Sequence, residues 1–235
     1  MIRRMFTDIA AIYDRMNHVL SLGLDRRWRR LTVSGVKGTP MRILDIACGT
    51  GDMAFSLARR FPDAEIMGVD LTPAMLDIAR VKNVSPKIRF AEGDALDLSA
   101  SVPGLTFDLC TCAFGFRNFP DRRKALREAR RVLAPGGELV VLEFFKPENA
   151  LLGLFTSAWL WMLSMAFAPG RTGAYRYLRE SMRGMVTEGA FVELAKAEGY
   201  ELSSRCFFLP CCTCLHLRVA QDVRFCACQE ADDGV

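Results

Sequence analysis

The sequence lacks a strong net charge, internal repeats and low-complexity segments. Its formal net charge of +4 over 235 residues is too small to indicate a nucleic-acid-binding surface, although it suits contact with an anionic membrane. The nine cysteines do not resemble a disulfide framework. We therefore expect no nucleic-acid partner and a single α/β domain over residues 1–235, a length that allows a sizeable core.

A signal-peptide pattern is also missing. Asp8 and Asp14 interrupt the apolar residues of the N-terminus. Cys48, Cys110 and Cys112 fall in expected core strands or turns, which favours free thiols in a reducing compartment. We therefore expect a cytoplasmic protein. Peripheral contact with the inner face of the membrane and assembly into a homodimer remain open.

From residue 42 onward, apolar runs alternate with helical patterns, which favours a mostly parallel sheet with right-handed crossovers. Two final strands have no helix between them, so we expect an antiparallel hairpin at the edge of a seven-stranded sheet. The expected strands are 42–47, 65–70, 87–91, 107–113, 137–144, 200–208 and 212–220, and the expected helices are 52–61, 73–81, 121–133 and 187–198.

Three segments lie outside this alternation. Residues 1–34 have the spacing of two cap helices, with a break near residues 21–23. Residues 148–186 form an insertion whose stretch 151–170 carries no charge and is long enough to span a bilayer. Three interpretations of this stretch remain open. It is a lid packed on the domain, a lid that contacts lipid or encloses a hydrophobic substrate, or a membrane span, and the membrane span is the least favoured. Residues 221–235 form a tail that contains cysteines.

The most informative motif joins the first strand to the next helix. Asp45 lies within the apolar run, and Gly49 and Gly51 form a turn in which a ligand can approach the backbone closely. A second apolar run ends in Asp70, a carboxylate placed where a ribose is commonly bound through its hydroxyls. The chain is therefore expected to bind a cofactor that contains adenosine.

Two kinds of cofactor compete for this turn. Gly49, Gly51 and Ala54 also fit the dinucleotide fingerprint, but Asp45 and Asp52 beside the turn would disfavour a pyrophosphate. Carboxylates suit the ammonium and sulfonium groups of S-adenosylmethionine better. The acidic position, the glycine turn, Asp70 and a later Glu-Gly-Asp-Ala stretch resemble the class I methyltransferases with a Rossmann-like α/β fold. That resemblance implies that Asp94 reaches the adenine amino group and that Ala95 packs on the ring.

More specific motifs narrow the resemblance. Over most of its length, about residues 5–219, the chain resembles the ubiquinone/menaquinone-biosynthesis C-methyltransferase family. The resemblance implies transfer of a methyl group from S-adenosylmethionine to a ring carbon of a prenylated hydroquinone such as demethylmenaquinol. Its motifs are 13–17 (Tyr-Asp-Arg-Met-Asn), 20–23 (Leu-Ser-Leu-Gly), 114–118 (Phe-Gly-Phe-Arg-Asn), 142–144 (Leu-Glu-Phe) and 175–178 (Tyr-Arg-Tyr-Leu).

The resemblance also implies which residues form the site. Arg117 would face the quinol, with Asn118 and Tyr177 beside it, and Tyr13 would close over the cofactor. The expected cofactor-binding residues are Tyr13, Asp45, Gly49, Thr50, Gly51, Asp70, Leu71, Asp94, Ala95 and Ala113.

The sequence departs from the family pattern at three places. Ala113 stands where the family often has Ser, and Asp25 stands where it usually has His. Residues 184–187 (Gly-Met-Val-Thr) replace an expected Pro-Asp pair on the substrate side. A class I methyltransferase that acts on another lipid-like or small aromatic substrate is therefore the alternative. A cofactor-binding protein without enzymatic activity is a third hypothesis.

Methylation of a ring carbon sets two chemical requirements. A hydroquinone becomes nucleophilic at carbon once a hydroxyl loses its proton, so the site must stabilise a phenolate and accept that proton. Arg117 remains charged and donates in a fixed fork, which suits phenolate stabilisation with a water carrying the proton. A structural ion pair with Asp14 or Glu143 is the alternative for Arg117. His18 is the second candidate base, although it lies one helical turn from Asp14 and packing explains it as well.

Six cysteines lie near the C-terminus. Their spacings are Cys-Cys-x-Cys and Cys-x-Cys, whereas zinc sites usually have two Cys-x-x-Cys knuckles. If 212–220 is a strand, then Cys212, Cys214 and His216 share one face and form either half a zinc site or part of an apolar core. We favour the core and expect no metal ion.

Overall fold

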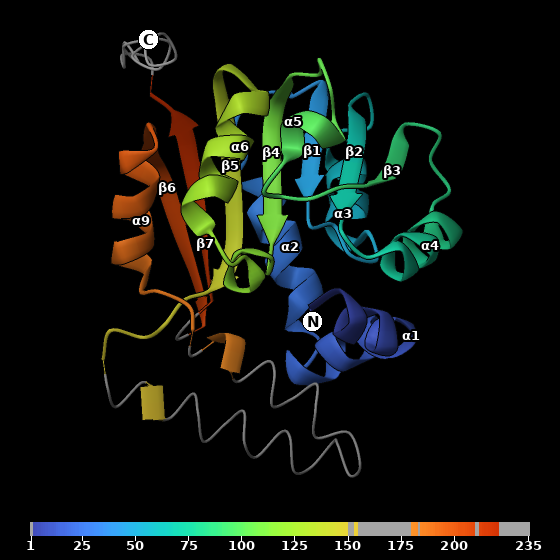
Figure 1. Cartoon of the computed structure of the whole chain (residues 1–235), viewed down its shortest axis with the longest axis horizontal. Helices are drawn as coiled ribbons and strands as arrows, with labels where there is room; N and C mark the ends of the chain where they lie inside the picture. The colour runs from blue at the N-terminus through green and yellow to red at the C-terminus, as the bar shows by residue number, and fades with distance from the viewer. Residues whose placement is uncertain (1, 150–152, 155–179, 183, 210–211, 221–235) are drawn as a thin grey trace, which may run out of the picture.

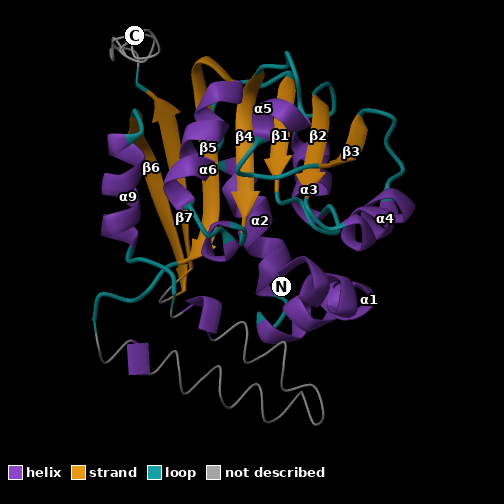
Figure 2. Cartoon of the chain, in the orientation of Figure 1, coloured by secondary structure: helices purple, strands orange, loops and turns teal. Residues whose placement is uncertain are grey.

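Seven strands form one twisted sheet between two layers of helices (Figure 1, Figure 2). The computed structural model describes residues 2–149, 153–154, 180–182, 184–209 and 212–220. The strand order is β3-β2-β1-β4-β5-β7-β6. The strands are β1 (Arg42–Ile46), β2 (Glu65–Asp70), β3 (Ile88–Glu92), β4 (Phe107–Ala113), β5 (Leu133–Phe144), β6 (Tyr200–Leu209) and β7 (Cys212–Val219).

The first five strands are parallel, and β7 is antiparallel to both of its neighbours, β5 and β6. The expected hairpin is therefore present and the last strand, β7, is the antiparallel one, which confirms the expected mostly parallel seven-stranded sheet. The edge strand, however, is β6 and not β7. After a helical crossover, β6 lies one position beyond β5, and β7 then fills the gap between them. This order is that of an open α/β sheet whose ligands bind beyond the carboxyl ends of the parallel strands.

Helices cover both faces of the sheet. α2 (Leu24–Ser34) and α3 (Asp52–Arg60) pack on one face, and α5 (Leu98–Ser101), α6 (Arg122–Val132) and α9 (Glu188–Ala197) pack on the other. α1 (Ile2–Leu20) and α4 (Pro73–Lys82) lie next to each other at the carboxyl ends of the strands (Figure 1). The short 3-10 helix η1 (Phe116–Asn118) follows β4.

Alternating side chains of each strand form two separate cores. On β1, Ile43 joins the cluster with Trp28 of α2 and Leu57 of α3. Leu44 joins the opposite cluster, with Leu126 of α6. All of these residues are buried, so each face of the sheet is closed by the helices that the crossovers place there.

The structure corrects some expected boundaries. The strand expected at 137–144 begins at Leu133, which pairs with Phe107 before the register shifts and Glu138 pairs with Leu109. Gly136 has a φ of 73° and lies at this irregularity within the strand. The sequence analysis missed α5 and η1, because helices of three or four residues show no periodicity. Tyr177, the apolar stretch 151–170 (apart from residues 153–154) and the tail 221–235 lie outside the described residues.

Within the described part of the chain, none of the helices has both the length and the apolar character needed to cross a bilayer.

Candidate active site

The turn between β1 and α3 has an unusual backbone. Ala47, Gly49 and Gly51 have φ values of 53°, 54° and 86°. A Cβ atom on Gly51 would lie 3.0 Å from ring carbons of Phe55 and Phe90, so glycine is favoured there by packing as well as by conformation. The result is a tight loop that exposes backbone at the carboxyl end of the central strand.

Asp70 ties this loop to the end of β2. Its Oδ2 accepts a hydrogen bond from the backbone N–H of Gly49 at 2.9 Å, and its Oδ1 accepts one from the N–H of Thr72 at 2.8 Å. Burial raises the pKa of the carboxyl, and the two backbone donors partly oppose that shift. Each carboxylate oxygen can accept more than one hydrogen bond, so Asp70 can also bind ribose hydroxyls.

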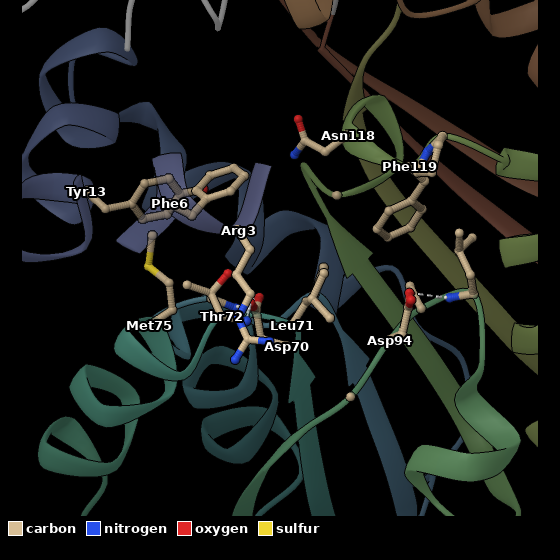
Figure 3. A pocket seen from close by; sticks show the side chains of 17 residues that line it. Arg3, Phe6, Tyr13, Asp70, Leu71, Thr72, Met75, Asp94, Asn118 and Phe119 are labelled. Atoms are coloured by element: carbon tan, nitrogen blue, oxygen red, sulfur yellow. Dashed lines mark hydrogen bonds between the residues drawn. The ribbon is translucent and has the colours of Figure 1, made fainter. Parts of the chain in front are cut away.

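A cavity of about 410 Å³ opens beside this carboxylate. One wall comes from the ends of β1 and β2, and a second comes from Asp94 and Ala95 after β3 and from Asn118 of η1. Arg3, Phe6 and Tyr13 of α1 complete the wall on the opposite side (Figure 3). This volume is in the range of small-ligand sites, and the mixture of apolar walls with few polar groups is typical of them.

Two further carboxyl groups belong to this region. Oδ1 of Asp94 accepts a hydrogen bond from the N–H of Leu96 at 2.9 Å, which fixes the side chain at the cavity wall (Figure 3). Asp45 lies behind the loop and is 1% exposed. Its Oδ1 accepts from the Thr111 hydroxyl at 2.7 Å, whereas its Oδ2 has no hydrogen-bond partner among the described residues. Burial raises the pKa of Asp45 to about 7, despite the Thr111 hydrogen bond.

α1 is fastened to the glycine loop by polar contacts. The Thr50 hydroxyl donates to Oδ1 of Asp14, and Nζ of Lys82 lies 2.9 Å from Oδ2 of Asp14 and 2.6 Å from Oδ1 of Asp52. Arg3 also pairs with Glu92 at 2.7 Å. These contacts place Tyr13 next to the loop, where a Cβ on Gly49 would lie 3.9 Å from its ring.

Arg117 forms a buried ion pair. Its Nη1 lies 2.6 Å from Oε1 of Glu143, and its backbone N–H donates to Oε2 at 3.1 Å. Its guanidinium carbon lies 5.5 Å from the ring centroid of Phe114 and 5.8 Å from that of Phe144. Of the two partners suggested by the sequence, the structure therefore pairs Arg117 with Glu143. The next residue along the chain, Asn118, lines the cavity.

His18 lies in a different group. Its Nδ1 is 3.1 Å from Oδ1 of Asp25, and Asp25 also accepts from Arg29 at 2.9 Å. Burial alone would raise the pKa of Asp25, but Arg29, Ser21 and His18 together lower it below the ordinary value. A Cβ on Gly23 would lie 3.1 Å from the His18 ring, so this imidazole packs in the corner between α1 and α2 and does not line the cavity.

The structure gathers part of the expected site. Five expected residues are not on the cavity wall, and their contact with a ligand stays a prediction: Asp45, Thr50, Gly51, Ala113 and Arg117. The expected residues that line the cavity are Tyr13, Gly49, Asp70, Leu71, Asp94, Ala95 and Asn118.

The sequence analysis missed several residues of the cavity wall. Some follow strand ends directly, so their position in the sequence could have indicated them. Phe6 lies two helical turns before Tyr13 on α1 and so shares its face. The missed residues are Arg3, Phe6, Ala47, Thr72, Met75, Gly93, Leu96, Gly115, Phe119 and Pro120.

Among the residues that the structure describes, no group of three or more His, Cys, Asp or Glu side chains could bind a metal ion. Cys212, Cys214 and His216 share one face of β7 as expected, and all three are buried.

The sheet order, the glycine loop and Asp70 together define a class I methyltransferase fold. A solved complex of a methyltransferase with the Haloferax volcanii Trm112 activator shares this fold, with a TM-score of 0.69, 16% identity and coverage of 95% of this chain and 99% of that one.

Sequence comparison gives the family. The ubiE/COQ5 methyltransferase family model matches residues 1–219, and the chain belongs to this family. The chain is 44% identical to the demethylmenaquinone methyltransferase of Deinococcus radiodurans, over 87% of this chain and 86% of that protein. It is 45% identical to the protein of the same name from Thermus thermophilus, over 84% and 92%. It is thus an S-adenosylmethionine-dependent methyltransferase.

The cavity fits this cofactor. Asp70 and Asp94 both line the cavity, and each carboxylate keeps lone pairs that can accept hydrogen bonds from a ligand. Asp45 lies behind the loop and does not line the cavity, and a cationic ligand would favour the ionised form of its carboxyl group.

Proposed function

We propose that this chain methylates a ring carbon of a prenylated hydroquinone, with demethylmenaquinol as the acceptor. The names of the two bacterial relatives and the family match support this acceptor. The structural observation that carries the proposal is the buried Arg117–Glu143 pair, whose guanidinium lies beside the stacked rings of Phe114 and Phe144. Arg117 immediately precedes the cavity residue Asn118 in the chain. A fixed guanidinium at this point suits an acceptor that becomes a phenolate.

The residues of this chain would have the following roles in the methyl transfer. Asp70 and Asp94 bind and orient the cofactor from the cavity wall, Asp45 acts from behind the glycine loop, and Tyr13 with α1 covers the cofactor. The bound cofactor supplies an electrophilic methyl group on its sulfonium. Arg117, positioned by Glu143, stabilises the phenolate oxygen, so that negative charge reaches the adjacent ring carbon while a water accepts the hydroxyl proton. His18 is the second candidate to accept the hydroxyl proton. It is the less favoured candidate because its ring pairs with Asp25 and does not line the cavity.

The apolar part of the cavity wall favours a hydrophobic methyl acceptor. Phe6, Leu71, Phe119 and Pro120 line it together with the few polar groups described above. Tyr177, which the family resemblance places at the substrate, lies outside the described residues, and its role stays a prediction.

The test is single-turnover transfer of labelled methyl from S-adenosylmethionine to reduced and to oxidised demethylmenaquinone. We expect transfer to the reduced form alone, and a loss of about 10²–10³ in rate for Arg117→Ala, because removing one preorganised donor typically costs that much. Arg122→Ala is the matched control, since its guanidinium donates to backbone oxygens of Phe116 and Gly184 and forms no ion pair with a described carboxylate. Cofactor binding without transfer to either form would point to a different acceptor, and the departure at 184–187 would be the first place to examine.

We also propose peripheral contact with the inner face of an anionic membrane. The outward face of α2 presents Arg26, Arg27 and Arg30, and exposed Leu22 and Leu31 flank them. The only acidic residue of α2, Asp25, is buried against Arg29. A basic face with exposed apolar side chains suits an anionic lipid surface.

Sedimentation with vesicles tests this contact. We expect binding to vesicles that contain phosphatidylglycerol, and loss of binding when Arg26, Arg27 and Arg30 are replaced by Gln. The same replacement at Arg123, Arg127 and Arg131 of α6 is the charge-matched control. The homodimer remains a prediction, and sedimentation equilibrium would test it.

A further inference from the structure

Two cysteines face each other across the outer pair of strands. Cys206 of β6 and Cys214 of β7 are register partners in the antiparallel pairing. Directly opposed residues of antiparallel strands point to the same face, with Cα atoms about 4.5–5.5 Å apart. A disulfide needs about 4.4–6.8 Å between Cα atoms, so the backbone already meets this requirement.

The two thiols differ in their access to solvent. Cys214 is fully buried and belongs to the core cluster that contains Trp28 of α2. Cys206 lies on the same face of the sheet, but β6 is the edge strand (Figure 1), and its thiol is exposed and free. An oxidant in solution therefore reaches Cys206 first, and Cys214 is the thiol directly behind it.

The other described cysteines are less well placed to form a disulfide with Cys206. Cys212 opposes Leu209, so it is a diagonal neighbour of Cys206, at a separation of about 7–8 Å that exceeds disulfide geometry. Cys110 and Cys112 belong to the core cluster on the opposite face of the sheet. The pairing thus selects a single partner for Cys206 within the described structure.

We infer that Cys206 and Cys214 form an oxidant-sensitive dithiol that closes to a cross-strand disulfide. The oxidant is a hydroperoxide. The Cys206 sulfur takes the terminal oxygen of the hydroperoxide, the O–O bond breaks, and an alcohol, or water from hydrogen peroxide, leaves. The Cys214 sulfur then attacks the sulfenic sulfur, the S–S bond forms, the S–O bond breaks, and water leaves with the Cys214 proton.

Burial should make closure slow at neutral pH. It raises the pKa of Cys214 to about 12, and the nearby Cys206 contributes in the same direction. The thiolate is the attacking species, so closure should accelerate about tenfold for each pH unit between about pH 7 and 9.

The experiment uses the full chain, reduced, freed of reductant and treated with hydrogen peroxide. Remaining thiols are blocked with N-ethylmaleimide, and the chain is cut with chymotrypsin, which separates Cys206 from Cys214. We expect the intact mass, measured before blocking, to fall by two hydrogens. The fragments should contain Cys206 linked to Cys214, while neighbouring cysteines carry the blocking group. Cys206→Ser and Cys214→Ser should each abolish the link, and the matched control Cys212→Ser should retain it.

Fragmentation of the wild-type peptides assigns the bond even if a variant fails to fold. A link that survives Cys214→Ser but disappears in Cys211→Ser or Cys212→Ser would overturn the inference, as would sulfenic acid at Cys206 that never converts to a disulfide at pH 9. Neither readout requires a methyl acceptor, so the outcome is independent of the proposed function.

Discussion

Asp14 and Lys82, which are 68 positions apart in the sequence, form an ion pair of 2.9 Å that joins the N-terminal helix to the end of α4. Lys82 also contacts Asp52 at the start of α3, and Asp14 also accepts from Thr50 in the glycine loop. Lys82 and Asp14 thereby connect α1, which forms part of the cavity wall, to the glycine loop on the same cavity. Ala10 is the only fully buried apolar residue of α1 among its described side chains, so these polar contacts matter for its position.

Lys82→Met should weaken S-adenosylmethionine binding. The three side chains are 31–39% exposed, and ion pairs of this kind contribute at most about 1 kcal/mol each. Loss of both pairs should raise Kd for the cofactor about three- to tenfold, with a smaller effect on kcat. Salt should weaken binding by wild type more than by the variant, because these contacts are screened. Titration calorimetry at two salt concentrations measures both effects.

Lys87→Met is the matched control, because Lys87 pairs with Asp63 at 3.5 Å on the exposed surface, away from the cavity. Equal losses in both variants would show that total charge, and not the fastening of α1, governs affinity. Lys82→Arg should restore most of the affinity if the ion pairs are responsible.

Asp45 should make stability depend on pH. Burial raises its pKa from 3.8 to about 7, so the folded state binds a proton that the unfolded state releases over this range. The stabilising contribution is therefore complete below about pH 4 and is lost as pH rises through 7, with an upper limit of about 4 kcal/mol. Asp45→Asn should remove this dependence, so that the variant gains stability relative to wild type between pH 4 and 8. Urea unfolding of the cofactor-free protein across that range is the measurement.

Cofactor binding should show the opposite trend. A cationic ligand favours ionised Asp45, so wild-type affinity for S-adenosylmethionine should rise with pH up to about 7 and then level off. The Asn variant should bind more weakly with a flatter profile. Identical pH profiles for the two proteins would mean that the carboxyl is not coupled to the cofactor.

The parallel half of the fold was predictable because its signals are local. β1, β2 and β4 are buried apolar runs, and the turns between them carry glycine, proline or aspartate at positions that define element ends. The insertion of β7 between β5 and β6 was not predictable, since periodicity shows that strands exist but not which strands pair. The irregular start of β5 was missed for a related reason, because pairing with Phe107 draws Leu133 into the sheet.

The site residues also divide into those that local sequence signals predict and those that depend on tertiary contacts. Asp70 ends β2, and Gly49 and Asp94 come shortly after the ends of β1 and β3. Residues at the carboxyl ends of parallel strands converge, so the sequence alone predicts that these three lie together. Arg3 and Phe6 reach the cavity only because α1 docks through contacts between residues far apart in the chain. The partner of Arg117 was also left open by the sequence, because Asp14 and Glu143 were equally plausible on chemistry, and tertiary packing decides between them.

Asp70→Asn should disrupt both the loop and the ribose contact. The carboxylate accepts from Gly49 and Thr72, and an amide can accept through one oxygen only. We expect Kd for S-adenosylmethionine to rise at least tenfold, since a hydrogen bond to a charged group contributes about 1.5–3 kcal/mol. Asp77→Asn is the control, because Asp77 is exposed and pairs only with Arg80 among its described partners. An unchanged Kd in the Asp70 variant would contradict the assigned ribose site.

Gly51→Ala and Gly38→Ala should separate backbone strain from steric overlap. Both glycines have similar φ values, 86° and 78°, so alanine costs about 1–2 kcal/mol of strain at each. A Cβ at position 38 meets nothing within 4 Å, whereas at 51 it lies 3.0 Å from Phe55 and Phe90. The ring centroids of Phe55 and Phe90 are 6.1 Å apart, so the two rings contact each other and cannot both move aside without losing that contact. We therefore expect Gly51→Ala to lower the free energy of unfolding by about 1–3 kcal/mol more than Gly38→Ala, and to weaken cofactor binding as well. Equal destabilisation, measured by urea unfolding, would show that the loop can shift away from the two rings.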